Sequence, residues 1–85
     1  MQKIDIYTKG WCPYCSRAKS LLQAKGIEYN EIPIDTNPEL RSVMIERANG
    51  RSTVPQIFIG DVHVGGCDDL FALESKQSLD GLLEG

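Results

Sequence analysis

The chain has 85 residues, the length of one small domain, and we expect a single domain over residues 1–85. Its net charge of −3 and its scattered basic residues argue against a nucleic-acid partner, because phosphate binding needs a local excess of positive charge. No segment approaches the roughly 20 apolar residues of a membrane span, and Asp5 interrupts the N-terminal stretch where a signal peptide would be apolar. We therefore expect a cytoplasmic protein without membrane or nucleic-acid partners.

The first third of the chain predicts a strand, a helix and a second strand. Over residues 3–8, apolar or β-branched side chains alternate with polar ones, as they do in a half-buried strand. Over residues 13–25 the apolar positions recur at helical spacing, and Gly26 supplies a helix stop. Residues 27–34 predict a second strand, and Pro33 limits its pairing near the end.

The middle of the chain predicts a second helix followed by a β-hairpin. Asn37 suits the cap of that helix and Pro38 its first position, and residues 49–50 end it. The apolar runs 56–59 and 62–64 flank a Gly-Asp dipeptide, which is typical of a tight hairpin turn.

The last third predicts a helix and a terminal turn. Gly65-Gly66 ends the hairpin, a helix starts at Asp68-Asp69, and residues 79–83 form a turn rich in leucine. The order is then β-α-β, α, β-β, α. Since β-α-β crossovers between parallel strands are nearly always right-handed, we expect a thioredoxin-like α/β fold. Its four-stranded mixed sheet would be flanked by helices on both faces.

Two of the three cysteines stand as Cys12-Pro13-Tyr14-Cys15, where the first strand passes into the first helix. A spacing of three in a first helical turn places both side chains on one face, with Cα atoms about 5–6 Å apart, which suits a disulfide. Cys12 lies at the helix start, where free N–H groups, the helix dipole and Lys9 favour a thiolate. Cys15 lies a turn deeper. We therefore predict Cys12 as nucleophile and Cys15 as resolving thiol.

Two other interpretations of the cysteine pair remain. A structural zinc site needs four ligands, and only Cys67 and His63 are left to complete it. Those two residues belong to the distal hairpin and helix, so we predict no metal site. The pair could also be two buried structural cysteines, but its position at a helix start favours redox chemistry.

Three blocks of the sequence together resemble the signature blocks of glutaredoxins. They are residues 7–9 with the Cys-Pro-Tyr-Cys motif, residues 53–59 and residues 65–70, in this order and over almost the whole chain. The resemblance is closest to the short dithiol glutaredoxins of bacteria. It implies a monomeric enzyme that uses glutathione as co-substrate, with no tightly bound cofactor, to reduce protein disulfides and glutathione mixed disulfides.

The resemblance also implies a glutathione site. Its residues would be Lys9, Tyr14, Thr53, Val54, Pro55, Gly66, Cys67, Asp68 and Asp69. The bond before Pro55 would be cis, and the backbone of Val54 would pair with the cysteinyl part of glutathione like an added strand. The N–H groups of the helix start would bind the glutamyl carboxylate. Asp68 and Asp69 would take the glutamyl ammonium, cap the helix, or do both.

Several residues near these blocks keep two interpretations. Lys9 is either a ligand of the glycyl carboxylate or a solvated lysine. Tyr14 is either a flat wall for the tripeptide or part of the core. Cys67 is either a small buried filler or a regulatory thiol that becomes glutathionylated. Arg51 and Ser52 either help to attract anionic glutathione or, as we expect, lie on a solvated face. We expect His63 to be exposed and without a partner.

The expected partners are glutathione and disulfide-containing or glutathionylated proteins, ribonucleotide reductase being one candidate. Three rival functions remain. One is a redoxin served by thioredoxin reductase, although the glutathione-site blocks argue against it. Trp11 before the first cysteine is typical of thioredoxin, but thioredoxin has Gly-Pro between its cysteines and a longer chain. Another is an iron–sulfur carrier in which Cys12 and glutathione bridge a dimer, although Pro13 argues against it. The third is the first domain of a glutathione transferase, whose helical second domain 85 residues do not accommodate.

Overall fold

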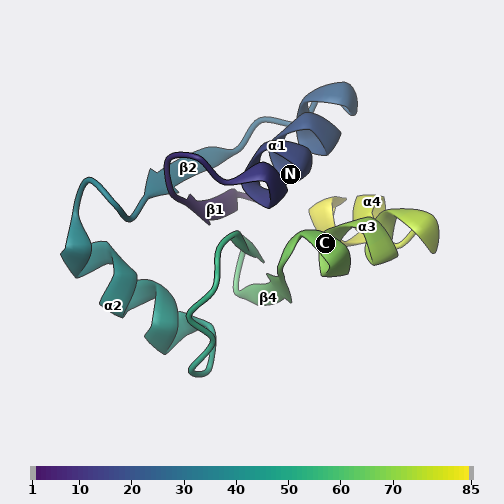
Figure 1. Ribbon diagram of the computed structural model, residues 1–85. Coiled ribbons are helices and arrows are strands. Elements are labelled where there is room, and N and C mark those ends of the chain that lie inside the picture. The colour runs from purple at the N-terminus through teal and green to yellow at the C-terminus, as the bar shows by residue number, and fades with distance from the viewer. Residues whose placement is uncertain (1, 85) are drawn as a thin grey trace.

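The computed structural model describes residues 2–84, which form one four-stranded sheet and four helices. The sheet order is β2-β1-β3-β4, with β1 parallel to β2 and antiparallel to β3, and with β3 and β4 as a hairpin. This is the predicted thioredoxin-like mixed sheet (Figure 1). The elements are β1 (Ile4–Thr8), α1 (Pro13–Ala24), β2 (Asn30–Pro33), α2 (Pro38–Arg47), β3 (Gln56–Ile59), β4 (Val62–Gly65), α3 (Cys67–Ser75) and α4 (Leu79–Glu84).

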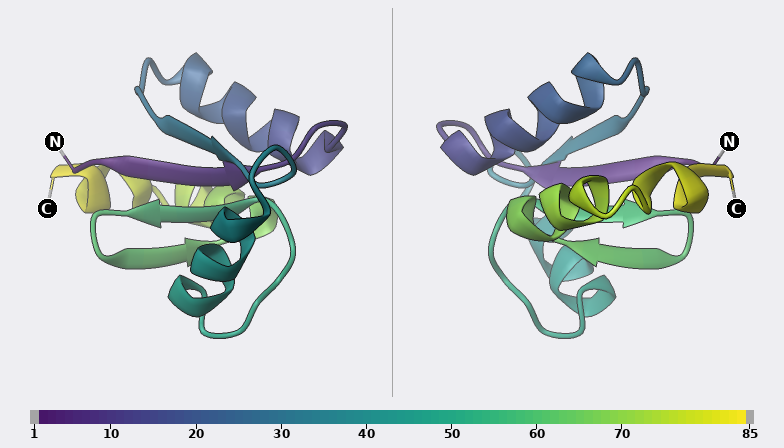
Figure 2. Two further views of the ribbon diagram at one scale, coloured as in Figure 1. Left: turned by 90° about the vertical axis from the view of Figure 1, so that its left-hand side faces the viewer. Right: turned by 90° about the vertical axis from the view of Figure 1, so that its right-hand side faces the viewer.

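The alternation of side chains along β1 explains why helices cover both faces of the sheet. Ile4 and Ile6 point to one face, where they join a buried cluster with residues of α1, α3 and α4. Tyr7 points to the other face and packs with Met44 of α2 and with Phe58 of β3. In the two opposed views of Figure 2, α2 lies in front of the sheet on the left and α3 and α4 lie in front on the right. The prediction of helices on both faces is confirmed.

Two of the three predicted helix starts, those of α1 and α2, are capped as their sequences indicate. Asn37 accepts the Glu39 N–H at 3.2 Å and Pro38 takes the first position of α2. At α1, Cys12 occupies the cap position and Pro13 the first helical position. Because α1 follows β1 after a loop of four residues, 9–12, the end of the central strand delivers Cys12 to the helix start.

The second strand is shorter than the predicted 27–34. The Ile27 N–H donates to the Leu22 carbonyl at 2.9 Å, so this residue takes part in the C-terminal cap of α1 and not in the sheet. Pairing with β1 begins only at Asn30, which lies opposite Asp5. An edge strand with a single neighbour has no other ladder to extend it, which limits β2 to four residues.

The predicted terminal turn is a helix, α4. Leu79 and Leu83 lie one turn apart and are both buried in the cluster that α1 and α3 share with the sheet. Burying these two side chains together requires helical spacing, which a turn does not supply. Within residues 2–84, no helix is both long enough and apolar enough to cross a membrane.

Candidate active site

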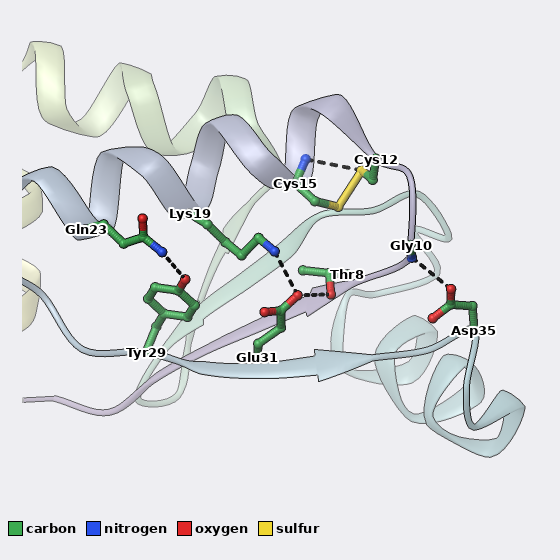
Figure 3. A network of polar contacts seen from close by, with 9 residues as sticks. All are labelled: Thr8, Gly10, Cys12, Cys15, Lys19, Gln23, Tyr29, Glu31 and Asp35. Carbon is green, nitrogen blue, oxygen red and sulfur yellow. Dashed lines mark hydrogen bonds and ion pairs between the residues drawn. A yellow bond between two sulfur atoms is a disulfide. The ribbon is translucent and has the colours of Figure 1, made fainter.

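The two cysteines of the motif form a disulfide in the first turn of α1 (Figure 3). Their Cα atoms are 5.1 Å apart, within the predicted distance. Cys15 is buried, with 2% of its surface exposed, whereas Cys12 is half-buried at the helix cap. A thiol or disulfide that approaches from solvent therefore reaches the sulfur of Cys12 first.

Backbone groups around Cys12 favour a negatively charged sulfur. The Cys15 N–H donates to the Cys12 Sγ at 3.1 Å, and the first turn of α1 carries no acidic residue. Once the disulfide is reduced, this N–H and the helix dipole stabilise a thiolate more than a neutral thiol. The Sγ atom also lies 3.9 Å from the carbonyl oxygen of Val54, which places the sulfur beside the loop before β3.

A groove of about 490 Å³ lies beside the cysteine pair, and we call it the Val54 groove. It is lined by Tyr14, Arg51, Thr53, Val54, Pro55, Gly66, Cys67, Asp68 and Asp69. The peptide bond between Val54 and Pro55 is cis, as the resemblance implied. The fold therefore brings together, from three separate segments, every residue of the predicted glutathione site except Lys9.

Lys9 lines a second groove, which reaches the cysteine pair from the side of β2. We call this space of about 610 Å³ the Glu31 groove; both Cys12 and Cys15 also line it. Because Cys12 touches Val54 as well as this space, the two grooves meet at its sulfur. Lys9 is exposed there and is thus separated from the rest of its predicted set.

Polar contacts in the Glu31 groove hold the loop from which the cysteine pair emerges (Figure 3). The Asp35 carboxylate accepts the Gly10 N–H at 2.8 Å. Deeper in the groove, Glu31 accepts the buried Thr8 hydroxyl at 2.8 Å and pairs with Lys19 at 3.0 Å. The Thr8 hydroxyl, followed by Lys19, holds the pKa of Glu31 below its usual value. The Asp35–Gly10 contact connects the loop between β1 and α1 to the segment that follows β2, and the contacts of Glu31 join β2 to β1 and α1.

The adjacent aspartates at the start of α3 have different surroundings. Asp69 accepts the Gly66 N–H at 2.9 Å and pairs with Arg51 at 3.4 Å, which makes it the capping residue. Asp68 is exposed in the Val54 groove, and within residues 2–84 no side chain or backbone group forms a hydrogen bond or ion pair with its carboxylate. Of the two carboxylates, the structure leaves Asp68 free to meet a ligand.

The cap of α3 predicts an acid-sensitive contribution to stability. The Gly66 N–H, followed by Arg51, lowers the pKa of Asp69 from its usual 3.8. A lowered folded-state pKa means that the native state binds fewer protons, so this stabilisation is present above about pH 4 and is lost as the pH falls through the folded pKa. We expect urea unfolding to show a smaller loss of stability between pH 6 and pH 3 in Asp69→Asn than in the wild type. Equal losses would contradict this assignment.

Three side chains near the cysteine pair were open or unassigned from sequence. Tyr14 is 56% exposed at the Val54 groove, which favours a wall over a core residue. Trp11 is 93% exposed directly before Cys12. Cys67 is buried, and burial raises the pKa of its thiol, which suits a small uncharged filler. Its regulatory role stays a prediction.

Of two expectations about basic side chains, one is confirmed and one is wrong. Arg51 is exposed, as expected, and it also lines the Val54 groove and pairs with Asp69. His63 is half-buried rather than exposed, and its Nε2 atom lies 2.7 Å from Oε1 of Gln56. The sequence contained a signal for the partial burial of His63, because a two-residue turn at Gly60-Asp61 sets His63 opposite Phe58. No pattern in the neighbouring residues predicts the contact of Arg51 with Asp69 of α3.

The site combines a redox-active cysteine pair with an adjoining groove. No group of three or more His, Cys, Asp or Glu side chains within residues 2–84 is arranged to hold a metal ion. A disulfide in the first turn of the helix that follows the central strand of a thioredoxin-like sheet can exchange with thiols, and once it is reduced Cys12 can attack other disulfides. The fold and site define a thiol-disulfide oxidoreductase.

Comparison with known proteins places the chain within this class. The glutaredoxin family model matches residues 4–64, and the chain belongs to the glutaredoxin family. It is 56% identical over 84 residues to glutaredoxin 3 of Escherichia coli (strain K12), covering 99% of this chain and 100% of the relative. The motif Cys12-Pro13-Tyr14-Cys15 makes it a dithiol member.

Solved structures agree with this family membership. The solution structure of glutaredoxin from Brucella melitensis superposes with a TM-score of 0.85 at 61% identity, covering 98% of this chain and 89% of the other. The crystal structure of a buckwheat glutaredoxin–glutathione complex superposes with a TM-score of 0.88 at 30% identity, covering 98% and 77%.

Proposed function

We propose that this protein is a glutathione-dependent oxidoreductase that reduces protein disulfides and glutathione mixed disulfides. It acts as a cytoplasmic, single-domain monomer without a tightly bound cofactor. The observation that carries the proposal is the Val54 groove, which gathers the predicted glutathione residues beside the accessible sulfur of Cys12. The buckwheat relative of the same fold, which is solved as a complex with glutathione, supports it.

The groove offers a complementary group for each part of the tripeptide. The loop residue Val54 presents its backbone for strand-like pairing with the cysteinyl unit, whose sulfur then points to Cys12. The N–H groups at the start of α3 receive the glutamyl carboxylate, and Asp68 receives the ammonium. Tyr14 forms a wall and Arg51 supplies positive charge for the carboxylates, while Lys9 adds positive charge from the neighbouring Glu31 groove.

The proposed reaction with a glutathione mixed disulfide uses only Cys12. Its thiolate attacks the sulfur of glutathione, the bond to the substrate sulfur breaks, and the substrate leaves as a thiolate that takes a proton from water. A second glutathione thiolate then attacks the Cys12–glutathione disulfide. This step releases oxidised glutathione and returns the Cys12 thiolate.

The proposed reaction with a protein disulfide uses both cysteines. Cys12 attacks one sulfur of the target and forms a mixed disulfide. The Cys15 thiolate then attacks the Cys12 sulfur and releases the reduced target. The Cys12–Cys15 disulfide of the structure is the product of this step, and two glutathione molecules reduce it in turn.

A coupled assay tests the proposed function. NADPH consumption is followed with glutathione, glutathione reductase and the mixed disulfide of glutathione and mercaptoethanol, with and without this protein. We expect strong acceleration by the protein. Absence of acceleration by folded, reduced protein would overturn the proposal, and a parallel assay with thioredoxin reductase would then test the first rival.

Substitutions of the two aspartates should separate ligand binding from capping. Asp68→Asn removes a charge that faces the groove, so we expect the KM for the mixed disulfide to rise about three- to tenfold with no change in the urea midpoint. Asp69→Asn weakens the cap and the Arg51 pair, so we expect it to lower stability by about 1 kcal/mol. If both variants lost stability equally, Asp68 would not be the free carboxylate.

A further inference from the structure

A chain of hydrogen bonds connects β4 to the Val54 groove through the interior of the protein. The Nε2 atom of His63 lies 2.7 Å from Oε1 of Gln56. The Nε2 atom of Gln56 donates to the hydroxyl of Thr53 at 3.2 Å. Gln56 is completely buried, whereas Thr53 is exposed at the groove. A polar side chain is therefore kept in the core with one partner on each side.

The atoms of Gln56 set the direction of this chain. An amide oxygen only accepts hydrogen bonds, so His63 must carry its proton on Nε2. The amide nitrogen of Gln56 in turn uses the Thr53 oxygen as its acceptor. The proton of the Thr53 hydroxyl is then not needed inside the protein, and it can be donated to an oxygen in the groove.

The ring of His63 is held in place by its neighbours. It stacks on Phe58 with ring centroids 4.8 Å apart, and the guanidinium of Arg47 lies 4.1 Å from the Phe58 centroid. Burial, followed by the positive charge of Arg51, lowers the pKa of His63, with Arg47 acting in the same sense and Asp69 opposing. A neutral ring with a fixed N–H donor is the result at neutral pH.

We propose that His63 is a positioning residue that, by anchoring the amide of Gln56, aims the Thr53 hydroxyl proton at a carbonyl or carboxylate oxygen of the bound tripeptide. This inference rests on the proposed glutathione function. It places a residue that determines the affinity for glutathione outside the Val54 groove. Without His63, the Oε1 atom of Gln56 loses its hydrogen-bond donor, and the amide group can rotate. The Thr53 hydroxyl is then free to donate back to Gln56 instead of to the ligand.

The first test removes the donor of His63 but keeps its ring. His63→Phe preserves stacking on Phe58, and we expect the KM for the glutathione mixed disulfide to rise about three- to tenfold while kcat stays unchanged. His63→Gln places an amide N–H where the Nε2–H stood and should restore the KM. An unchanged KM in folded His63→Phe, or no restoration by His63→Gln, would overturn the inference.

The second test asks whether His63 acts through Thr53. In a Thr53→Val background the hydroxyl is absent, so adding His63→Phe should leave the KM of that background unchanged. A rise as large as in the wild type would mean that His63 acts by another route. Urea midpoints of the four proteins separate this result from a general loss of stability.

A third measurement is independent of glutathione and of any variant. The ¹⁵N spectrum of the His63 ring in the wild type should show the proton on Nε2. A proton on Nδ1 would reverse the chain and overturn the inference. If the wild type shows no glutathione-dependent turnover, the proposed function fails, while this tautomer still decides whether the hydrogen-bond chain is directed as proposed.

Discussion

Cys12→Ser should reduce turnover of every disulfide substrate to the uncatalysed background, whereas Cys15→Ser should keep the reduction of glutathione mixed disulfides. The reason is the geometry of the pair. Cys12 is half-buried at the helix cap and receives the Cys15 N–H, while Cys15 is buried beneath it. A serine hydroxyl at position 12 is not ionised at neutral pH, so no nucleophile remains. The route through a single thiol does not need Cys15.

Two assays of the same variants measure this difference. We expect Cys15→Ser to reduce the mixed disulfide of glutathione and mercaptoethanol within about threefold of the wild-type rate, and to lose most activity on a protein disulfide, which needs the resolving step. Ser20→Ala, an exposed change further along α1, serves as control. Loss of both activities in folded Cys15→Ser, or retention of either activity in Cys12→Ser, would contradict the assignment of Cys12 as nucleophile and Cys15 as resolving thiol.

Gly65→Ala is expected to be the most damaging single-methyl change near the groove. Gly65 has a φ of +118°, and a Cβ there would overlap the Asp69 carboxylate and approach Arg51 Nη1 to 2.9 Å. The side chain both strains the backbone and displaces the capping carboxylate of α3. We expect a loss of about 2–4 kcal/mol in the free energy of unfolding, from backbone strain plus a lost cap, together with a raised KM for the mixed disulfide.

A matched glycine isolates the steric part of this effect. Gly50 has a φ of +95°, but a methyl group added to it would meet no atom within 4 Å, so Gly50→Ala should cost only the backbone term, about 1–2 kcal/mol. Urea unfolding of the two variants measures the difference. Equal losses would mean that Asp69 and Arg51 move aside freely, and the cap of α3 would then contribute little to the groove.

Much of the local structure followed from residues close together in the chain. The spacing of Cys12 and Cys15 predicted a closable disulfide at a helix start, and Asn37 predicted the cap of α2. Alternation along residues 3–8 predicted the first strand. These features depend on contacts between residues at most four apart, which the local sequence contains in full.

The resemblance extended these predictions to the site but not to its detailed contacts. It named every residue that lines the Val54 groove except Arg51, yet it could not say which aspartate caps α3 and which is left unpaired in the groove within residues 2–84. It also included Lys9, which the fold places in the neighbouring groove. Those distinctions depend on side-chain directions and on partners from other segments.

The sequence by itself determined the redox pair and the order of the elements as far as α3, and the resemblance added most of the residues that line the Val54 groove. Only the tertiary structure decided how these parts meet. Cys12 approaches Val54 across 42 positions of the chain, and Arg51 reaches Asp69 across 18. Such contacts arise when helices pack on both faces of the sheet and bury residues such as Gln56. Packing over long sequence separations has no local pattern from which it can be predicted.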